Sequence, residues 1–148
     1  MNIIQKIDQY NIKNVFYSDS IKNNIMNDSN FIRIIYSTSY VSLNGLSIFI
    51  PIINPIIEKY FNKYKCSFDV YSHAIIIDKI RTIEEGILRK INIKNKIPQC
   101  KIFEQVRNGN IKIFSDNIEK NNNTFLLKIA GIWETECNYG LTYKFIKA

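Results

Sequence analysis

The chain has 148 residues with a formal net charge of +7, and three residue types dominate it: 31 Ile, 19 Asn and 16 Lys. These are amino acids of A/T-rich codons, so coding bias accounts for part of the positive charge. A hydrophobic content of 46 % excludes a fully disordered chain, and a chain of this length can bury a real core. Charged residues interrupt every apolar run, so we expect no transmembrane helix and no membrane partner.

The N-terminal fifth of the chain differs from the rest in composition. Residues 1–30 are polar and Asn-rich, and we interpret them as an N-terminal arm or extension. Residues 31–148 then form a single β-rich domain. Its first segment, residues 31–41, is rich in β-branched and aromatic residues and predicts a strand.

Turn signals follow this first strand. Asn44-Gly45 predicts a tight turn, from which residues 46–50 return as a second strand that ends at the prolines. Residues 54–65 fit either a short helix or another strand. Residues 66–72 alternate in polarity and predict a third strand.

The clearest helical pattern lies at residues 73–92. Isoleucines recur there at intervals of four, three, four and four residues, which is one face of an amphipathic helix: Ile76, Ile80, Ile83, Ile87 and Ile91. Ser72 is the expected N-cap. His73 is expected at the surface or partly buried, and Glu84 and Glu85 are expected on the polar side.

The last third of the chain predicts strands. Residues 101–107 and 110–116 flank Asn108-Gly109, a dipeptide typical of two-residue hairpin loops. In that hairpin an aromatic pair would lie beside two cations on the outward face: Phe103, Phe114, Arg107 and Lys112.

One long strand and one final strand complete the prediction. Residues 124–136 predict a strand with a bulge or bend at Gly131, residues 138–140 turn the chain, and residues 141–148 return. Trp133 shares its parity with core residues, although a bend at Gly131 would turn it to the surface. The element order predicts a mainly β, α+β fold: a small OB-like barrel or a curved antiparallel sheet with one principal helix.

Catalytic and cofactor motifs are scarce. The chain has no Walker loop, GxGxxG or HExxH motif, and three scattered cysteines with one histidine do not predict a zinc site, so we expect neither an enzyme nor a cofactor. Aromatic residues instead alternate with basic ones along the predicted strands. Bases stack on aromatic rings while cations contact phosphates. The candidate nucleic-acid-binding residues are Arg33, Tyr36, Tyr40, Phe103, Arg107, Lys112, Phe114, Lys128, Trp133, Tyr139, Tyr143 and Lys144.

The segments 128–135 and 139–145 resemble the C-terminal end of small single-stranded DNA-binding proteins of yeast cytoplasmic linear (killer) plasmids and related A/T-rich DNA viruses. The resemblance implies a protein that coats displaced single strands during replication without sequence preference. It also implies an OB-like core, a homo-oligomer, residence in the host cytoplasm, and a replication polymerase or terminal protein as a partner.

Two other functions fit the same residues. One is an accessory module that binds a protein, whose exposed aromatics would form an apolar patch without flanking cations. The other is an RNA-binding protein, which would use the same stacking and phosphate contacts. A groove lined by Lys112, Arg107 and Lys144 would favour nucleic acid.

Overall fold

Strands are the most abundant secondary structure in the described chain. A computed structural model describes residues 4–19, 21–22, 29–61, 63–113 and 124–147. The N-terminal part contains β1 (Gln5–Lys6), 3-10 helices at Ile7–Gln9 and Ile12–Asn14, β2 (Val15–Tyr17), β3 (Ile21–Lys22), β4 (Asn30–Ser37), β5 (Ser42–Asn44), β6 (Leu46–Pro51), β7 (Ile56–Tyr60) and β8 (Lys63–Ser67). The C-terminal part contains α1 (Ala74–Ile91), β9 (Ile97–Gln99), α2 (Lys101–Val106), β10 (Asn110–Ile113), β11 (Thr124–Glu134) and β12 (Asn138–Lys147).

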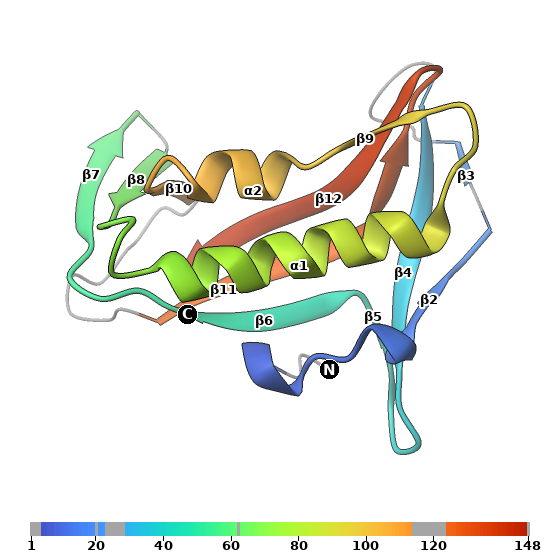
Figure 1. Ribbon diagram of the computed structural model, residues 1–148, viewed down its shortest axis with the longest axis horizontal. Coiled ribbons are helices and arrows are strands. Elements are labelled where there is room, and N and C mark those ends of the chain that lie inside the picture. The colour runs from blue at the N-terminus through green and yellow to red at the C-terminus, as the bar shows by residue number, and fades with distance from the viewer. Residues whose placement is uncertain (1–3, 20, 23–28, 62, 114–123, 148) are drawn as a thin grey trace.

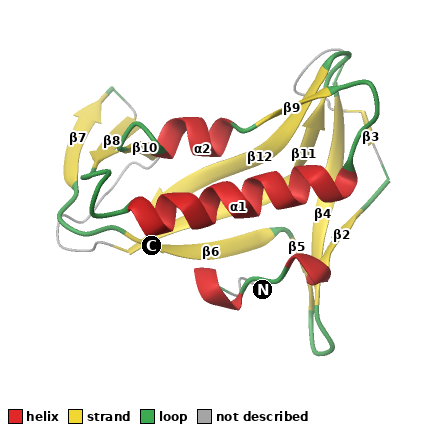
Figure 2. Ribbon diagram, viewed as in Figure 1, coloured by secondary structure: helices red, strands yellow, loops and turns green. Residues whose placement is uncertain are grey.

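The strands form an open, curved sheet, and α1 and α2 lie side by side over one of its faces (Figure 1; Figure 2). The main path of the sheet runs β1-β6-β11-β12-β10-β8-β7, and β4 pairs with β11 and carries β2, β3 and β5. The expected mainly β fold with one principal helix is therefore confirmed, with a curved open sheet in place of a closed barrel.

Strand β11 is the centre of the sheet because its length lets it pair with three neighbours. It pairs antiparallel with β12 along its length, with β6 over residues 124–129, and with β4 over residues 131–134. The register with β12 shifts between Ile129 and Gly131, which confirms the predicted bulge. The bulge therefore separates the part of β11 that faces β6 from the part that faces β4.

Helix α1 matches the helix predicted at residues 73–92. Its isoleucine stripe packs on the sheet, with Ile80, Ile83 and Ile87 buried. The N-cap residue is His73 rather than Ser72, whose amide donates to Asp69 Oδ2 at 3.2 Å.

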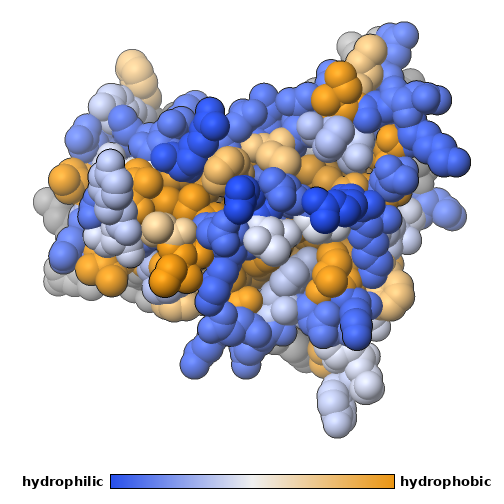
Figure 3. All heavy atoms as spheres, in the orientation of Figure 1, coloured by the Kyte–Doolittle hydropathy of each residue, from blue (hydrophilic) through white to orange (hydrophobic). Residues whose placement is uncertain are grey.

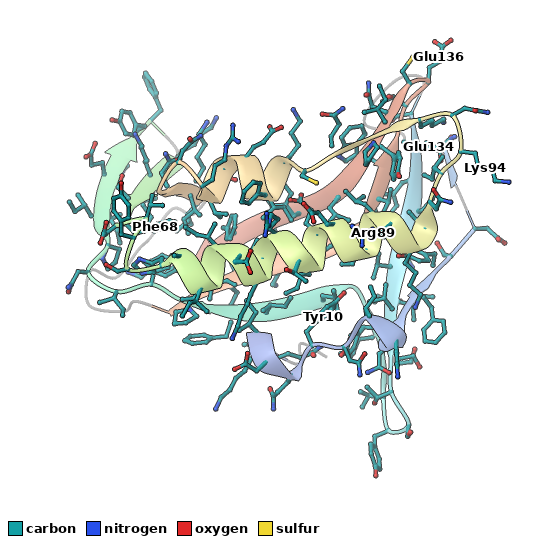
Figure 4. The ribbon with its side chains drawn as sticks, viewed as in Figure 1. Tyr10, Phe68, Arg89, Lys94, Glu134 and Glu136 are labelled. Atoms are coloured by element: carbon teal, nitrogen blue, oxygen red, sulfur yellow. The ribbon has the colours of Figure 1, made fainter. Side chains whose placement is uncertain are left out.

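His73 is buried rather than at the surface, with 2 % of its side chain exposed. Its Nε2 accepts the Ile53 N–H at 2.9 Å, so Nδ1 carries the proton and donates to the Asp69 carbonyl at 2.6 Å. The ring of Phe68, labelled in Figure 4, packs edge-on against the imidazole. His73 thus joins the chain before α1 to the end of β6.

The predicted hairpin around Asn108-Gly109 is wrong, because residues 101–106 form helix α2. Two buried side chains one turn apart, Ile102 and Val106, face the core. The buried carboxylate of Glu84 accepts the N–H groups of Ile102 at 2.9 Å and Phe103 at 2.8 Å. A side chain from α1 thus caps α2, and the prediction that Glu84 lies on the polar side of α1 is also wrong.

Three other boundaries differ from the prediction. The turn after β4 spans residues 38–41, where Thr38 N–H donates to the Val41 carbonyl, rather than Asn44-Gly45. Gly45 instead leads from β5 into β6 with φ of +84°, and a Cβ there would lie 2.8 Å from the Ile129 carbonyl oxygen. Strand β8 ends at Ser67, and the turn before β12 spans residues 135–138.

The described residues of the segment interpreted as an N-terminal arm contact both the sheet and α1. Strand β1 pairs in parallel with β6, while β2 and β3 pair with β4. Val15 is fully buried, and the Tyr17 hydroxyl donates to the Ile87 carbonyl at 2.6 Å. Tyr10, labelled in Figure 4, stacks on Tyr36. Within the described ranges, neither helix has the length and apolar character needed to span a bilayer.

We predict that Glu84→Ala lowers the free energy of unfolding by about 2 kcal/mol or more, because it leaves one buried and one part-buried N–H group without an acceptor. Chemical denaturation measures the loss. The matched control is Glu85→Ala at the exposed neighbouring position, expected to change stability by less than about 0.5 kcal/mol. Equal effects of the two substitutions would contradict the capping role.

We also predict a pH dependence from Glu84, whose pKa burial raises above its ordinary value of 4.5 despite the two N–H donors. The folded-state pKa exceeds the unfolded one, so this stability contribution is full below the unfolded pKa and declines as pH rises through the folded-state pKa. The free energy of unfolding of the wild type minus that of Glu84→Gln should therefore fall between acidic and neutral pH. A difference that rises over this range would contradict the prediction.

Candidate nucleic-acid interface

Four lysines lie in a row across adjacent strands on the sheet face that the helices leave uncovered. Lys128 of β11 pairs with Lys144 of β12, and Lys112 of β10 pairs with Lys65 of β8. Strands β10 and β12 run parallel with Ile113 beside Phe145, which places the preceding residues, Lys112 and Lys144, next to each other. We call these four residues the lysine track.

Side-chain alternation fixes the face on which the lysine track lies. The residues that follow the lysines in β10, β12 and β8 are Ile113, Phe145 and Cys66, and all three are buried in the core beneath the helices. Successive side chains of a strand point to opposite faces, so the lysines point away from the helices. One register therefore sets both the core and the basic row.

The lysine track is electrostatically unfavourable by itself. Neighbouring strands lie about 4.8 Å apart, and like charges directly opposite each other destabilise a sheet. Among the described residues, none of the four lysines forms an ion pair. An anion bound along the row would relieve this repulsion.

Three adjoining hollows follow the track. Lys128 and Lys144 line a hollow of about 410 Å³ with Asn44 and Thr142. Lys144 also lines a hollow of about 490 Å³ together with Lys112 and, from α2, Lys101 and Glu104. A third hollow, of about 430 Å³, is lined by Lys112 and Lys65 and by an aromatic cluster: Tyr60, Phe61 and Tyr64. Shared lysines thus join the three hollows into one basic surface.

Tyr143 lies in the wall between β12 and α2, beside the central hollow. Its hydroxyl donates to Gln105 Oε1 at 2.9 Å, and its ring packs edge-on against Phe145. Burial, and then the charges of Glu84 and Glu104, raise the pKa of Tyr143 to about 12. The phenol is therefore neutral at physiological pH and adds no negative charge to the basic surface.

The structure brings together only part of the predicted site. Lys112, Lys128, Tyr143 and Lys144 line the joined hollows. Arg33 and Tyr40 are exposed but line none of the three hollows, and Tyr40 is 95 % exposed at the turn between β4 and β5.

Phe103 and Arg107 do lie together, but on helix α2 rather than in a hairpin. The guanidinium groups of Arg107 and Arg81 lie 6.0 Å and 5.7 Å from the centre of the Phe103 ring. Four residues apart is helical spacing, so the helix accounts for the pairing of Phe103 with Arg107. Phe114, the expected partner of Phe103, lies outside the described residues.

Two predicted stacking residues are core residues instead. Tyr36 and Tyr139 are only 3 % and 4 % exposed, so neither ring is open to a base. Both face the interior because they alternate with outward residues on β4 and β12. The Tyr36 hydroxyl accepts the Asn11 N–H at 3.0 Å and so helps to attach the N-terminal segment.

The bulge decides the position of Trp133. After the register shift, Ile132 is fully buried, and Trp133 falls on the uncovered face, where it is half-buried. The indole packs directly over Gly140, where a Cβ would lie 2.7 Å from the ring. Part of Trp133 therefore remains accessible on the same sheet face as the lysine track.

Five basic or aromatic residues of the third hollow were not predicted: Tyr60, Phe61, Lys63, Tyr64 and Lys65. They lie in a stretch whose sequence fits both a helix and a strand, so their faces could not be assigned. The available signal was the alternation of lysines with Tyr and Cys at residues 63–66.

A second basic area lies on the helix side, at the end of α1. Arg89 and Lys94, labelled in Figure 4, are exposed there, and Lys96 forms an ion pair with Glu134. Glu85 also lines this hollow of about 430 Å³, and Glu134 neutralises Lys96 beside it. Figure 3 shows hydrophilic side chains along the outer sides of α1 and α2.

Known proteins add no assignment: no family model, curated protein or solved structure matches the chain. Within the described residues, no group of three or more His, Cys, Asp or Glu side chains is arranged to hold a metal ion.

We predict that Lys144→Gln raises the free energy of unfolding by about 0.2–1 kcal/mol at low salt, because it removes a cation that lies between two others. The gain should vanish near 1 M salt, where the Debye length is about 3 Å. Chemical denaturation at both salt concentrations measures it, with exposed Lys13→Gln as the control. A loss of stability at low salt would contradict the repulsion.

Proposed function

We propose that this protein binds single-stranded DNA without sequence preference across the uncovered face of the sheet. The observation that carries the proposal is the lysine track, which places four cations on adjacent strands without an ion pair among the described residues. Such a row matches a linear chain of phosphates. A compact anion would contact only one or two of the lysines.

The hollows beside the track favour a single strand over a duplex. Unstacked bases are available only in single strands, and the hollows next to Lys112 and Lys144 offer each base a place beside its phosphate. Proteins that hold single strands combine a basic groove with aromatic platforms and tolerate any sequence. Exposed Phe61 provides aromatic surface along this path, whereas half-buried Tyr143 lines the central hollow from the side of α2.

The C-terminal resemblance supports the same function. Its matching segment contains Lys128 and Lys144, both of which belong to the track. We extend the proposal to coating of strands displaced during replication of an A/T-rich selfish or viral element in the host cytoplasm. A replication polymerase or terminal protein, and further copies of the chain, are the partners that this role would require.

RNA is the nearest alternative ligand, because stacking and phosphate contacts serve both nucleic acids. A protein ligand fits less well, since the aromatics of the third hollow are flanked by Lys63, Lys65 and Lys112 rather than forming a purely apolar patch. Competition between oligo-dT and oligo-U tests the preference between DNA and RNA.

We predict that Lys112→Glu/Lys144→Glu weakens oligo-dT binding on the order of tenfold or more at 50 mM salt, because two phosphate contacts become repulsive. Fluorescence anisotropy measures the dissociation constants. Quenching of Trp133, the single tryptophan, provides an independent signal on the same sheet face.

The matched control is Lys13→Glu/Lys94→Glu, which changes the net charge equally at exposed positions away from the track. We expect it to bind within about threefold of the wild type, because only long-range attraction is lost. Equal weakening by both double variants would contradict the proposed site, and no binding of oligo-dT at low salt would contradict the function.

A further inference from the structure

The β7–β8 hairpin ends in an exposed aromatic side chain. The two strands pair from Ile56 with Ser67 to Tyr60 with Lys63, and Phe61 directly follows β7 at the end of the hairpin. The Phe61 side chain is 97 % exposed, and its backbone has a φ of +52°. A large apolar side chain thus occupies a left-handed position in full contact with solvent.

Phe61 is unfavourable for stability on two counts. Two-residue hairpin loops with positive φ favour Asn, Asp or Gly, because a side chain that begins with a bulky Cβ substituent is strained there. The exposed ring also contributes nothing to the core. Residues held in such conformations concentrate at binding sites, where the geometry serves a ligand.

The position of the ring relative to the lysine track indicates that ligand. Phe61 lines the same hollow as Lys65 and Lys112, two members of the track, and as Lys63 of the same hairpin. Strand β7 is the last strand on this path of the sheet, so the hairpin lies at one end of the track. Phosphates held by these lysines would bring their bases next to the ring.

We propose that Phe61 is a base-stacking residue that closes one end of the nucleic-acid path. This inference rests on the proposed single-strand binding and deepens it, because it adds a contact residue from residues 54–65, a stretch whose sequence fits both a helix and a strand. The ring contacts the base, while Lys65 and Lys112 contact the phosphates on either side. The contact is independent of sequence, because every base has a π-face.

The test compares two ligands and two substitutions. Oligo-dT carries bases, whereas an abasic strand of equal length carries only the sugar-phosphate chain. Phe61→Asn removes the ring and introduces a residue that tolerates positive φ, whereas Phe61→Trp retains an aromatic ring. Tyr71→Asn is the control, because Tyr71 is 92 % exposed and outside the three hollows of the track.

We expect Phe61→Asn to weaken oligo-dT binding by at least about fivefold, the effect of losing one stacked base, and to leave abasic-strand binding unchanged. Phe61→Trp should retain the wild-type preference for oligo-dT, and Tyr71→Asn should have no effect. Phe61→Asn should also raise Tm by about 2 °C or more, because it relieves backbone strain.

The outcomes separate the inference from the function on which it rests. If oligo-dT binds but Phe61→Asn keeps the wild-type preference over the abasic strand, the stacking role is overturned and the lysine track still stands. If the wild type binds no single strand, the proposed function itself fails. A third outcome is that the wild type binds phosphatidylserine vesicles and Phe61→Asn loses that binding but keeps the wild-type preference for oligo-dT. This result would assign the ring to a membrane surface and overturn the inference.

Discussion

The register of β11, β12 and β10 is the constraint on which the rest of the structure depends. It buries Phe145 and Ile113 beneath the helices and, by simple alternation, turns Lys144 and Lys112 to the other face. A one-residue shift in the pairing of β10 or β12 would turn that strand's lysine into the core and its apolar neighbour to the open face. The stability of the hydrophobic core therefore holds the lysines in a row despite their mutual repulsion, which lets the surface remain ready for a polyanion.

Features with a local cause were predictable from the sequence. The isoleucine stripe of α1 and the bulge at Gly131 both follow from residues close together in the chain. Helix α2 was not predictable, because its capping carboxylate comes from Glu84, eighteen residues before Ile102. Ile102 and Val106, the residues that made 101–107 look like a half-buried strand, also lie one helical turn apart. The same two apolar residues therefore fit a helix equally well, provided that its first N–H groups have an acceptor.

The candidate site follows the same division. Lys112, Lys128 and Lys144 were identified singly from the aromatic residues near them, but their alignment depends on parallel pairing of β10 with β12. That pairing joins segments more than thirty residues apart in the chain, so no turn motif in the sequence could predict it. Tyr36 and Tyr139 were assigned to the site because a strand pattern shows alternation but not which of the two faces is covered. The contribution of the structure is to show which face the helices leave open.

The most direct test of the lysine track is the salt dependence of oligo-dT binding. For single strands, the slope of log K against log salt concentration is about −0.7 for each phosphate neutralised. If the track holds phosphates, Lys112→Gln and Lys144→Gln should each make the slope shallower by about 0.7, while Lys13→Gln leaves it unchanged. Identical slopes for all three variants would contradict the account.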